Sequence, residues 1–203
     1  QRVNDQAGNE MTDKSIPDGK NLADEIVDIY VDGVLPVDPG TAITMVSTGV
    51  NVVADKYNDT NTGVNFTVAI QSSDASLVGG TIQIKAKIAP NGWASIGDPH
   101  RMTDANKTAG SATISVLSAP IEALTSFDTD AEIKIKATVT DVAGNSTDWA
   151  ESTNSLTVDV TRPTITSATS TTDAGLYNTA DAINTTLGFN EAVTLSGGDL
   201  TIT

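Results

Sequence analysis

The sequence contains no cysteine and only one histidine among its 203 residues. The absence of cysteine excludes disulfide bonds, thiolate metal sites and cysteine nucleophiles. A single imidazole cannot build a transition-metal site rich in histidine. Aromatic residues make up 4% of the chain, so few rings can form a binding surface, although a hydrophobic fraction of 38% still fills a thin β-sandwich core.

Basic residues and long apolar runs are scarce as well. The 11 Lys and Arg residues stand against 26 Asp and Glu residues, which gives a formal net charge of −15. Because nucleic-acid binding needs clustered basic side chains, composition argues against a nucleic-acid partner. No run approaches the roughly 18 apolar residues of a membrane span, so we expect no membrane insertion within this sequence.

A five-residue pattern occurs twice. Asp5–Asn9 reads DQAGN, and Asp141–Asn145 reads DVAGN. Each copy is followed by a strand-like segment of the form Val-Asp-x-x-x-Pro, at Val31–Pro36 and at Val158–Pro163. Recurrence in the same order predicts an array of related modules.

A second repeat supports the first. Tyr57-Asn58 precedes an apolar strand and then Gly79-Gly80, and Tyr177-Asn178 precedes a similar segment and then Gly197-Gly198. Spacings that agree to within about one residue are typical of equivalent strands with different loops. We therefore predict three pieces, namely the closing strands of one module (1–33), a complete module (34–160) and the opening strands of a third (161–203).

Strict alternation of apolar and polar residues predicts strands at Thr81–Ile88 and Glu132–Val139. Shorter strands are expected at 65–70, 112–117 and 155–160. No segment of ten or more residues has a helical period, so the predicted class is all-β, with tandem antiparallel β-sandwich modules. The outward lysines of the two long strands are interpreted as edge protection. A lysine–asparagine isopeptide crosslink is the alternative.

The segments at the module ends resemble a known family. Ala137–Asn145, Leu156–Val160 and Pro163–Ile165 resemble the closing strands and linker of bacterial Ig-like repeats, and Ile165–Ser167 and Phe189–Thr194 resemble their opening strands. Such repeats occur in giant surface adhesins and other large secreted proteins. The resemblance implies an immunoglobulin-like fold, an extracellular or cell-surface location, and calcium near the module junctions.

Carboxylate and amide oxygens are suitable calcium ligands. The candidate ligands of the complete module are Asp141, Asn145 and Asp159, and the corresponding residues of the first piece are Asp5, Asn9 and Asp32, with Asp28 as an extra carboxylate. A metal bound at a junction would stiffen the array. The alternative is turn chemistry without metal, because Asp and Asn bond the local backbone and Gly adopts positive φ.

The sequence shows no catalytic set. A Ser-His-Asp triad would have to use His100, which lies in a turn-like segment without a nucleophile signature. The leading hypothesis is therefore a stiff spacer or fibre-forming segment, an adhesin stalk or cell-surface filament, that contacts neighbouring modules and other copies. The alternative is an accessory module of a secreted protein or hydrolase that binds a glycan or protein through Trp93 and Tyr57. The segment 91–110 is either a binding loop or a strand connection pinned by Trp93.

Overall fold

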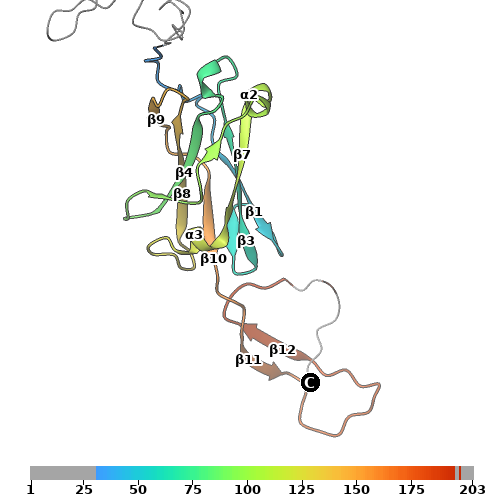
Figure 1. Cartoon of the computed structure of the whole chain (residues 1–203). Coiled ribbons are helices and arrows are strands. Elements are labelled where there is room, and N and C mark those ends of the chain that lie inside the picture. The colour runs from blue at the N-terminus through green and yellow to red at the C-terminus, as the bar shows by residue number, and fades with distance from the viewer. Residues whose placement is uncertain (1–30, 195–196, 198–203) are drawn as a thin grey trace, which may run out of the picture.

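Alternating apolar residues build the two central strands, β4 (Thr81–Ile88) and β8 (Glu132–Thr140). The two strands pair antiparallel along all of β4, with Ile84 opposite Ala137. Their apolar side chains are buried on one face, and their polar side chains lie on the other, as a period of two requires. The structure, a computed structural model, describes residues 31–194 and residue 197 (Figure 1).

The described strands form two packed sheets and a separate hairpin. The larger sheet has the order β2-β10-β8-β4-β5, with β6 beside β4 and β9 beside β8, and the smaller sheet has the order β1-β3-β7. The remaining bounds are β1 (Thr44–Gly49), β2 (Lys56–Asn58), β3 (Asn61–Ala69), β5 (Ala94–Ser95), β6 (His100–Arg101), β7 (Ser111–Leu117), β9 (Ser146–Asp148) and β10 (Ser155–Asp159). The all-β class predicted from the sequence is confirmed.

One hydrophobic core joins the two sheets. Phe66 of β3 and Ile114 of β7 lie on one side of it, and Ile84 and Ile135 of the larger sheet lie on the other. Each fully buried side chain of this size contributes roughly 1.5–3 kcal/mol to folding, so this shared core holds the sheets together. We call residues 44–159 the two-sheet body.

Three short helical segments cover the ends of the two-sheet body. They are η2 (Ala75–Leu77), α2 (Asp104–Ala109) and α3 (Ser118–Glu122). Thr103 and Asn106 form a capping box at the start of α2, and Gly110 ends the helix with a φ of 67°. These helices are shorter than the ten residues at which a sequence period becomes visible. No helix in the described residues has the length and apolarity needed to cross a bilayer.

The first extended segment of the body is split into two strands, β1 and β2, which belong to different sheets. β1 pairs antiparallel with β3, whereas β2 pairs parallel with β10, with Tyr57 opposite Val158. The predicted antiparallel arrangement therefore does not hold at this one pair. The chain changes sheets over residues 50–55 without reversing direction, and the Ser47 hydroxyl holds the crossing by donating to the Lys56 carbonyl over 2.6 Å.

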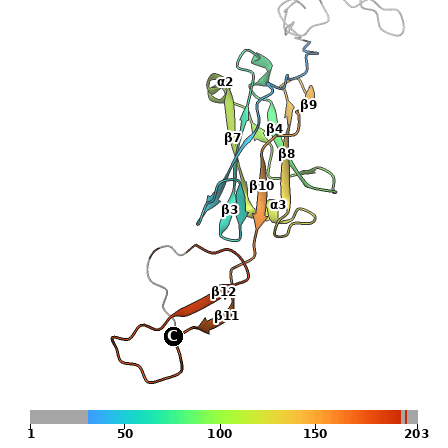
Figure 2. The same ribbon diagram turned by 180° about the vertical axis from the view of Figure 1, so that it is seen from behind.

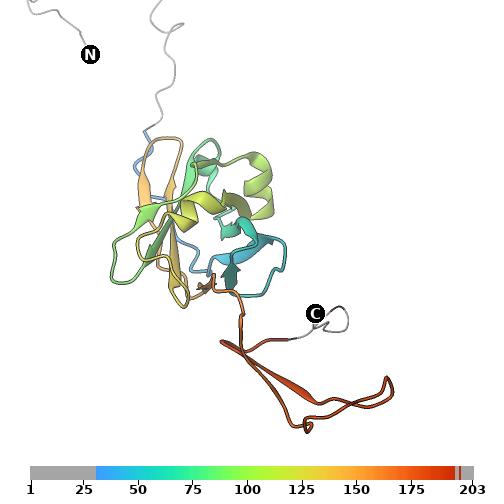
Figure 3. The same ribbon diagram turned by 90° about the horizontal axis from the view of Figure 1, so that it is seen from below.

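A hairpin of β11 (Ile165–Ser170) and β12 (Thr185–Phe189) follows the two-sheet body. Its strands pair antiparallel, as β1 and β3 do, and all three views show it clear of the body (Figure 3). The side chains of β11 are exposed throughout. A two-stranded hairpin alone is marginally stable in water, so this pair has little stability of its own.

The chain enters the two-sheet body at one end and leaves it at the other (Figures 1 and 2). We call the end near β9 and α2 the upper end, and the end near α3 the lower end. β8 runs from the lower to the upper end, and β10 runs back beside it. The repeated turn and the linker that leaves the body therefore lie at different ends.

Candidate functional site

The repeated turn, Asp141–Asn145, lies at the upper end of β8 and is closed by its own hydrogen bonds. Asp141 is buried, and its carboxylate accepts from the Asn145 backbone N–H over 2.8 Å and from Asn145 Nδ2 over 2.9 Å. Gly144 adopts a φ of 95° within the turn. The repeated five-residue motif thus forms a tight turn around one buried carboxylate.

The ionisation of Asp141 depends on this geometry. Burial alone would raise the pKa of Asp141, but hydrogen bonds from the Asn145 side chain and from the backbone N–H groups of Asn145, Gly144 and Ala143 outweigh it. The net result is a pKa below the ordinary value of an aspartate. The carboxylate is therefore charged at neutral pH and acts as the acceptor that organises the turn.

The turn also holds the chain that enters the body. Asn145 Nδ2 donates to the Asp32 carbonyl over 3.0 Å, and the Ala150 N–H donates to Asp38 Oδ2 over 2.9 Å. Ser152 Oγ and Asn154 Nδ2 both donate to the Ile43 carbonyl. The turn and the segment that follows it thus contact the chain that precedes β1.

Asp159 does not join this group. It ends β10 at the lower end, whereas Asp141 follows the last residue of β8 at the upper end. At about 3.3 Å per residue, the length of β8 alone separates the two by roughly 26 Å. The predicted set of Asp141, Asn145 and Asp159 is therefore corrected, because β8 carries the turn to the end opposite the outgoing linker.

The described residues of this group do not form a calcium cage. Both carboxylate oxygens of Asp141 accept hydrogen bonds, and Asp32 offers its carbonyl to Asn145 while its Oδ1 accepts from the Val34 N–H. Among the described residues, no three His, Asp or Glu side chains come together as metal ligands. Asp5, Asn9 and Asp28 lie outside the described residues, so their part in a junction site stays a prediction.

A second polar group lies on the outer face of the larger sheet. Lys85 and Lys87 of β4 and Lys134 and Lys136 of β8 all point away from the core, and each contacts a carboxylate. We call these four residues the lysine face. Lys85 lies directly opposite Lys136 in the strand register, so two like charges meet across the ladder.

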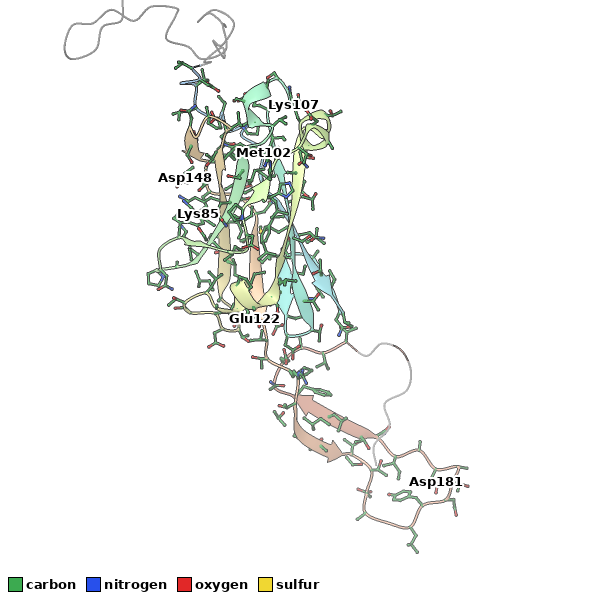
Figure 4. The ribbon with its side chains drawn as sticks, viewed as in Figure 1. Lys85, Met102, Lys107, Glu122, Asp148 and Asp181 are labelled. Atoms are coloured by element: carbon green, nitrogen blue, oxygen red, sulfur yellow. The ribbon has the colours of Figure 1, made fainter. Side chains whose placement is uncertain are left out.

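Asp148 neutralises this opposed pair. Its carboxylate contacts Lys85 Nζ at 3.1 Å and Lys136 Nζ at 2.6 Å, and it accepts from the Thr138 hydroxyl (Figure 4). Lys136, Thr138 and Lys85 together hold the pKa of Asp148 well below its ordinary value. Sequence reasoning missed this residue, because one of its two lysine partners, Lys85, lies on a strand 63 positions earlier in the chain.

The substitution D148N should destabilise the protein by about 1 kcal/mol at neutral pH, after allowance for screening of a side chain that is 43% exposed. Because the folded-state pKa lies below the unfolded value of about 3.9, this contribution is present above about pH 4 and is lost in acid. Urea denaturation at pH 7 and in strong acid measures both effects. E151Q, which removes a contact with one lysine, is the matched control and should cost less. An equal loss in both variants contradicts the role of Asp148.

Trp93 lies half-buried beside the lysine face. Lys87 Nζ is 4.4 Å from the centroid of its ring, and Lys136 Nζ is 5.0 Å from it. The segment 91–110 is held instead by Ile96 and Met102, which are buried in the core. Trp93 therefore covers two lysines, and it does not anchor the segment 91–110 to the core. A contact between Trp93 and a ligand stays a prediction.

Tyr57 is a core residue and not a surface contact. It is fully buried at the lower end, where its hydroxyl donates to Glu122 Oε1 over 2.8 Å and its ring packs edge-on against Phe127. Burial, followed by the interaction with Glu122, raises the pKa of its phenol well above the ordinary value. The prediction of Tyr57 as a ligand contact is thus corrected, since its position in β2 turns the side chain inward.

The single histidine contributes to local structure. His100 Nε2 lies 3.2 Å from Asn106 Oδ1, the same oxygen that closes the capping box of α2. The contact ties β6 to the start of that helix.

Comparison with known proteins identifies no relative of this chain. No family model matches the chain, and neither a curated protein nor a solved structure shows significant similarity to it.

Proposed function

We propose that this chain is a load-bearing structural repeat of a long extracellular protein, in which tandem Ig-like modules form a stiff spacer or fibre segment. The observation that carries the proposal is the parallel pairing of β2 with β10 in a body whose chain ends emerge at opposite ends. Tension along the chain draws β2 upward and β10 downward. Their hydrogen bonds are then loaded together in shear.

The strand arrangement supports the Ig-like assignment. An Ig-like β-sandwich packs two largely antiparallel sheets over one core. Here the sheet β1-β3-β7 packs on the sheet β2-β10-β8-β4. The first extended segment contributes one strand, β1 or β2, to each sheet. The β11–β12 hairpin repeats the antiparallel pairing of β1 with β3, as the opening strands of a following module would.

Contacts at both ends support a stiff array. At the upper end, Asn145 and the Ala150 N–H hold the incoming chain. At the lower end, Arg162 pairs with Asp59, and the Thr129 and Thr161 hydroxyls lie 2.7 Å apart. Pro163 follows directly and fixes its own φ, which limits bending of the short linker.

Single-molecule force spectroscopy tests the load-bearing role. Pulled by its two termini, the chain should show a distinct unfolding peak for the two-sheet body, because the β2–β10 bonds break together. The double variant D59C/D159C provides handles at the lower ends of β2 and β10, and the absence of native cysteine makes attachment specific. Pulling these handles apart unzips the same pair one bond at a time, and we expect a several-fold lower force.

Equal forces in the two geometries, or unfolding without a resolved peak when the termini are pulled, would contradict a load-bearing role. Thermal unfolding of D59C/D159C in reducing buffer checks that the variant retains the fold, since D59C also removes the contact with Arg162.

A further inference from the structure

The two long sides of the two-sheet body differ in how they are closed. On the β1 side, the chain crosses from one sheet to the other, and the Ser47 hydroxyl holds the crossing at Lys56. Val52 and Val53 of the crossing lie beside Met45 and line a hollow of about 230 Å³ with β1. The crossing therefore runs beside β1.

On the β7 side, the loop 97–100 lies beside the strand but does not pair with it. Within residues 31–194, β7 pairs with β3 on one side and with no strand on the other. A hollow of about 440 Å³ lies between residues 114–117 of β7 and the loop 97–100. Leu117, at the end of the strand, has 73% of its surface exposed. This edge has the unpaired backbone of a strand that can accept another.

The sequence of this edge lacks the usual protection against pairing. Exposed edge strands normally carry charges, prolines or bulges. β7 reads SATISVL, seven residues without a charge or a proline, in a chain with a net charge of −15. β1, at the other edge of the same sheet, contains an irregularity between Thr48 and Gly49, whereas β7 pairs with β3 in an unbroken register.

We propose that β7 is a self-association strand that pairs antiparallel with β7 of a second copy of this chain. A second copy fits because the strand is self-complementary. When Ile114 faces its own equivalent across a two-fold axis, Thr113 lies opposite the second copy's Ser115, and no charges meet. The smaller sheet then continues from one copy into the next, as an isologous interface requires.

On the outer face of the smaller sheet, small polar side chains of β7 already pair with those of β3. The Thr67 and Thr113 hydroxyls lie 3.1 Å apart, and Ser115 Oγ donates to Asn65 Oδ1 over 2.7 Å. A second β7 extends this row of small polar side chains across the axis. The inference goes beyond the spacer function and does not depend on it, because any domain with this edge would associate in the same way.

Sedimentation velocity of the full chain over a concentration series tests the proposal. We expect a reversible dimer that is strengthened by added salt, because the interface is uncharged while two copies at −15 repel each other. In T113K/S115K, lysines face each other across the axis, and the dimer should weaken by about tenfold or more. In T113E/S115K, each lysine faces a glutamate, so the dimer should persist.

The substitution V46K is the matched control, because Val46 is exposed on the same sheet but belongs to β1, on the far side of β3 from β7. Its dimer should be unchanged. A monomer at every concentration, a dimer indifferent to T113K/S115K, or equal loss in T113K/S115K and T113E/S115K would overturn the proposal. The exposed positions of Thr113 and Ser115 permit these changes without disturbing the core, and thermal unfolding verifies the fold of each variant.

Discussion

Replacing Gly80 by alanine is expected to destabilise the two-sheet body by about 3 kcal/mol or more. A Cβ at this position would lie 2.2 Å from the Thr140 carbonyl oxygen and 2.8 Å from Asp141 Cα, which are backbone atoms at the end of β8 and the start of the turn. Since neither can move as a flexible side chain would, β4 and β8 must separate where the buried turn begins. Denaturant unfolding measures the loss.

Gly92 provides the control for this substitution. No atom lies within 4 Å of a Cβ at position 92, and its backbone needs no glycine-specific φ. G92A should therefore be neutral or slightly stabilising, since alanine lowers the entropy of the unfolded chain. A G80A protein as stable as G92A would show that β4 and β8 do not approach as closely as the structure places them.

Removal of the Asp141 carboxylate is the second large effect. D141A should cost about 2–3 kcal/mol, because it leaves the Asn145 backbone N–H and Asn145 Nδ2 without their buried acceptor. Thermal unfolding in millimolar calcium and in excess chelator separates the two interpretations of the turn. A turn without metal predicts the same loss in both buffers.

Asp159 is the control, because it is exposed at the far end of β10. D159A should change stability by less than about 0.5 kcal/mol in either buffer. A D141A effect that appears only in calcium would instead identify the turn as a metal site. The Asp141 contribution should also disappear in acid. Its folded-state pKa is lowered, so the stabilisation is present above the unfolded value of about 3.9 and is lost as pH falls through the folded value.

The long strands could be predicted because each covers a core on one side. The alternation in Thr81–Ile88 predicted the bounds of β4 without error, and that in Glu132–Val139 missed only the last residue of β8. β2 could not be found in this way, because three residues are too short to show a period and their neighbour lies in β10. The parallel pairing on which the proposed function depends was therefore invisible in the sequence.

The site was predicted only in part for a related reason. Asp141 and Asn145 share one turn, so their separation of four positions was enough to bring them together. Asp159 was placed with them because sequence order does not show the end at which a strand finishes. Asp148 was missed because Lys85 lies on another strand, 63 positions earlier. Contacts within a local motif can be predicted from the sequence, whereas contacts between distant strands can be predicted only when the strand topology is known.

The pairing of β2 with β10 also has a consequence for the order of folding. Tyr57 and Val158 are opposite each other although they are about a hundred positions apart, so closing this loop is slow compared with forming the local β1–β3 pair. During synthesis the first strands can pair early, but β2 has no partner in the larger sheet until β10 has emerged. Until then the emerging chain has its β1–β3 pair but not its β2–β10 pair, so the pairing on which the proposed load-bearing role depends forms in a single late step.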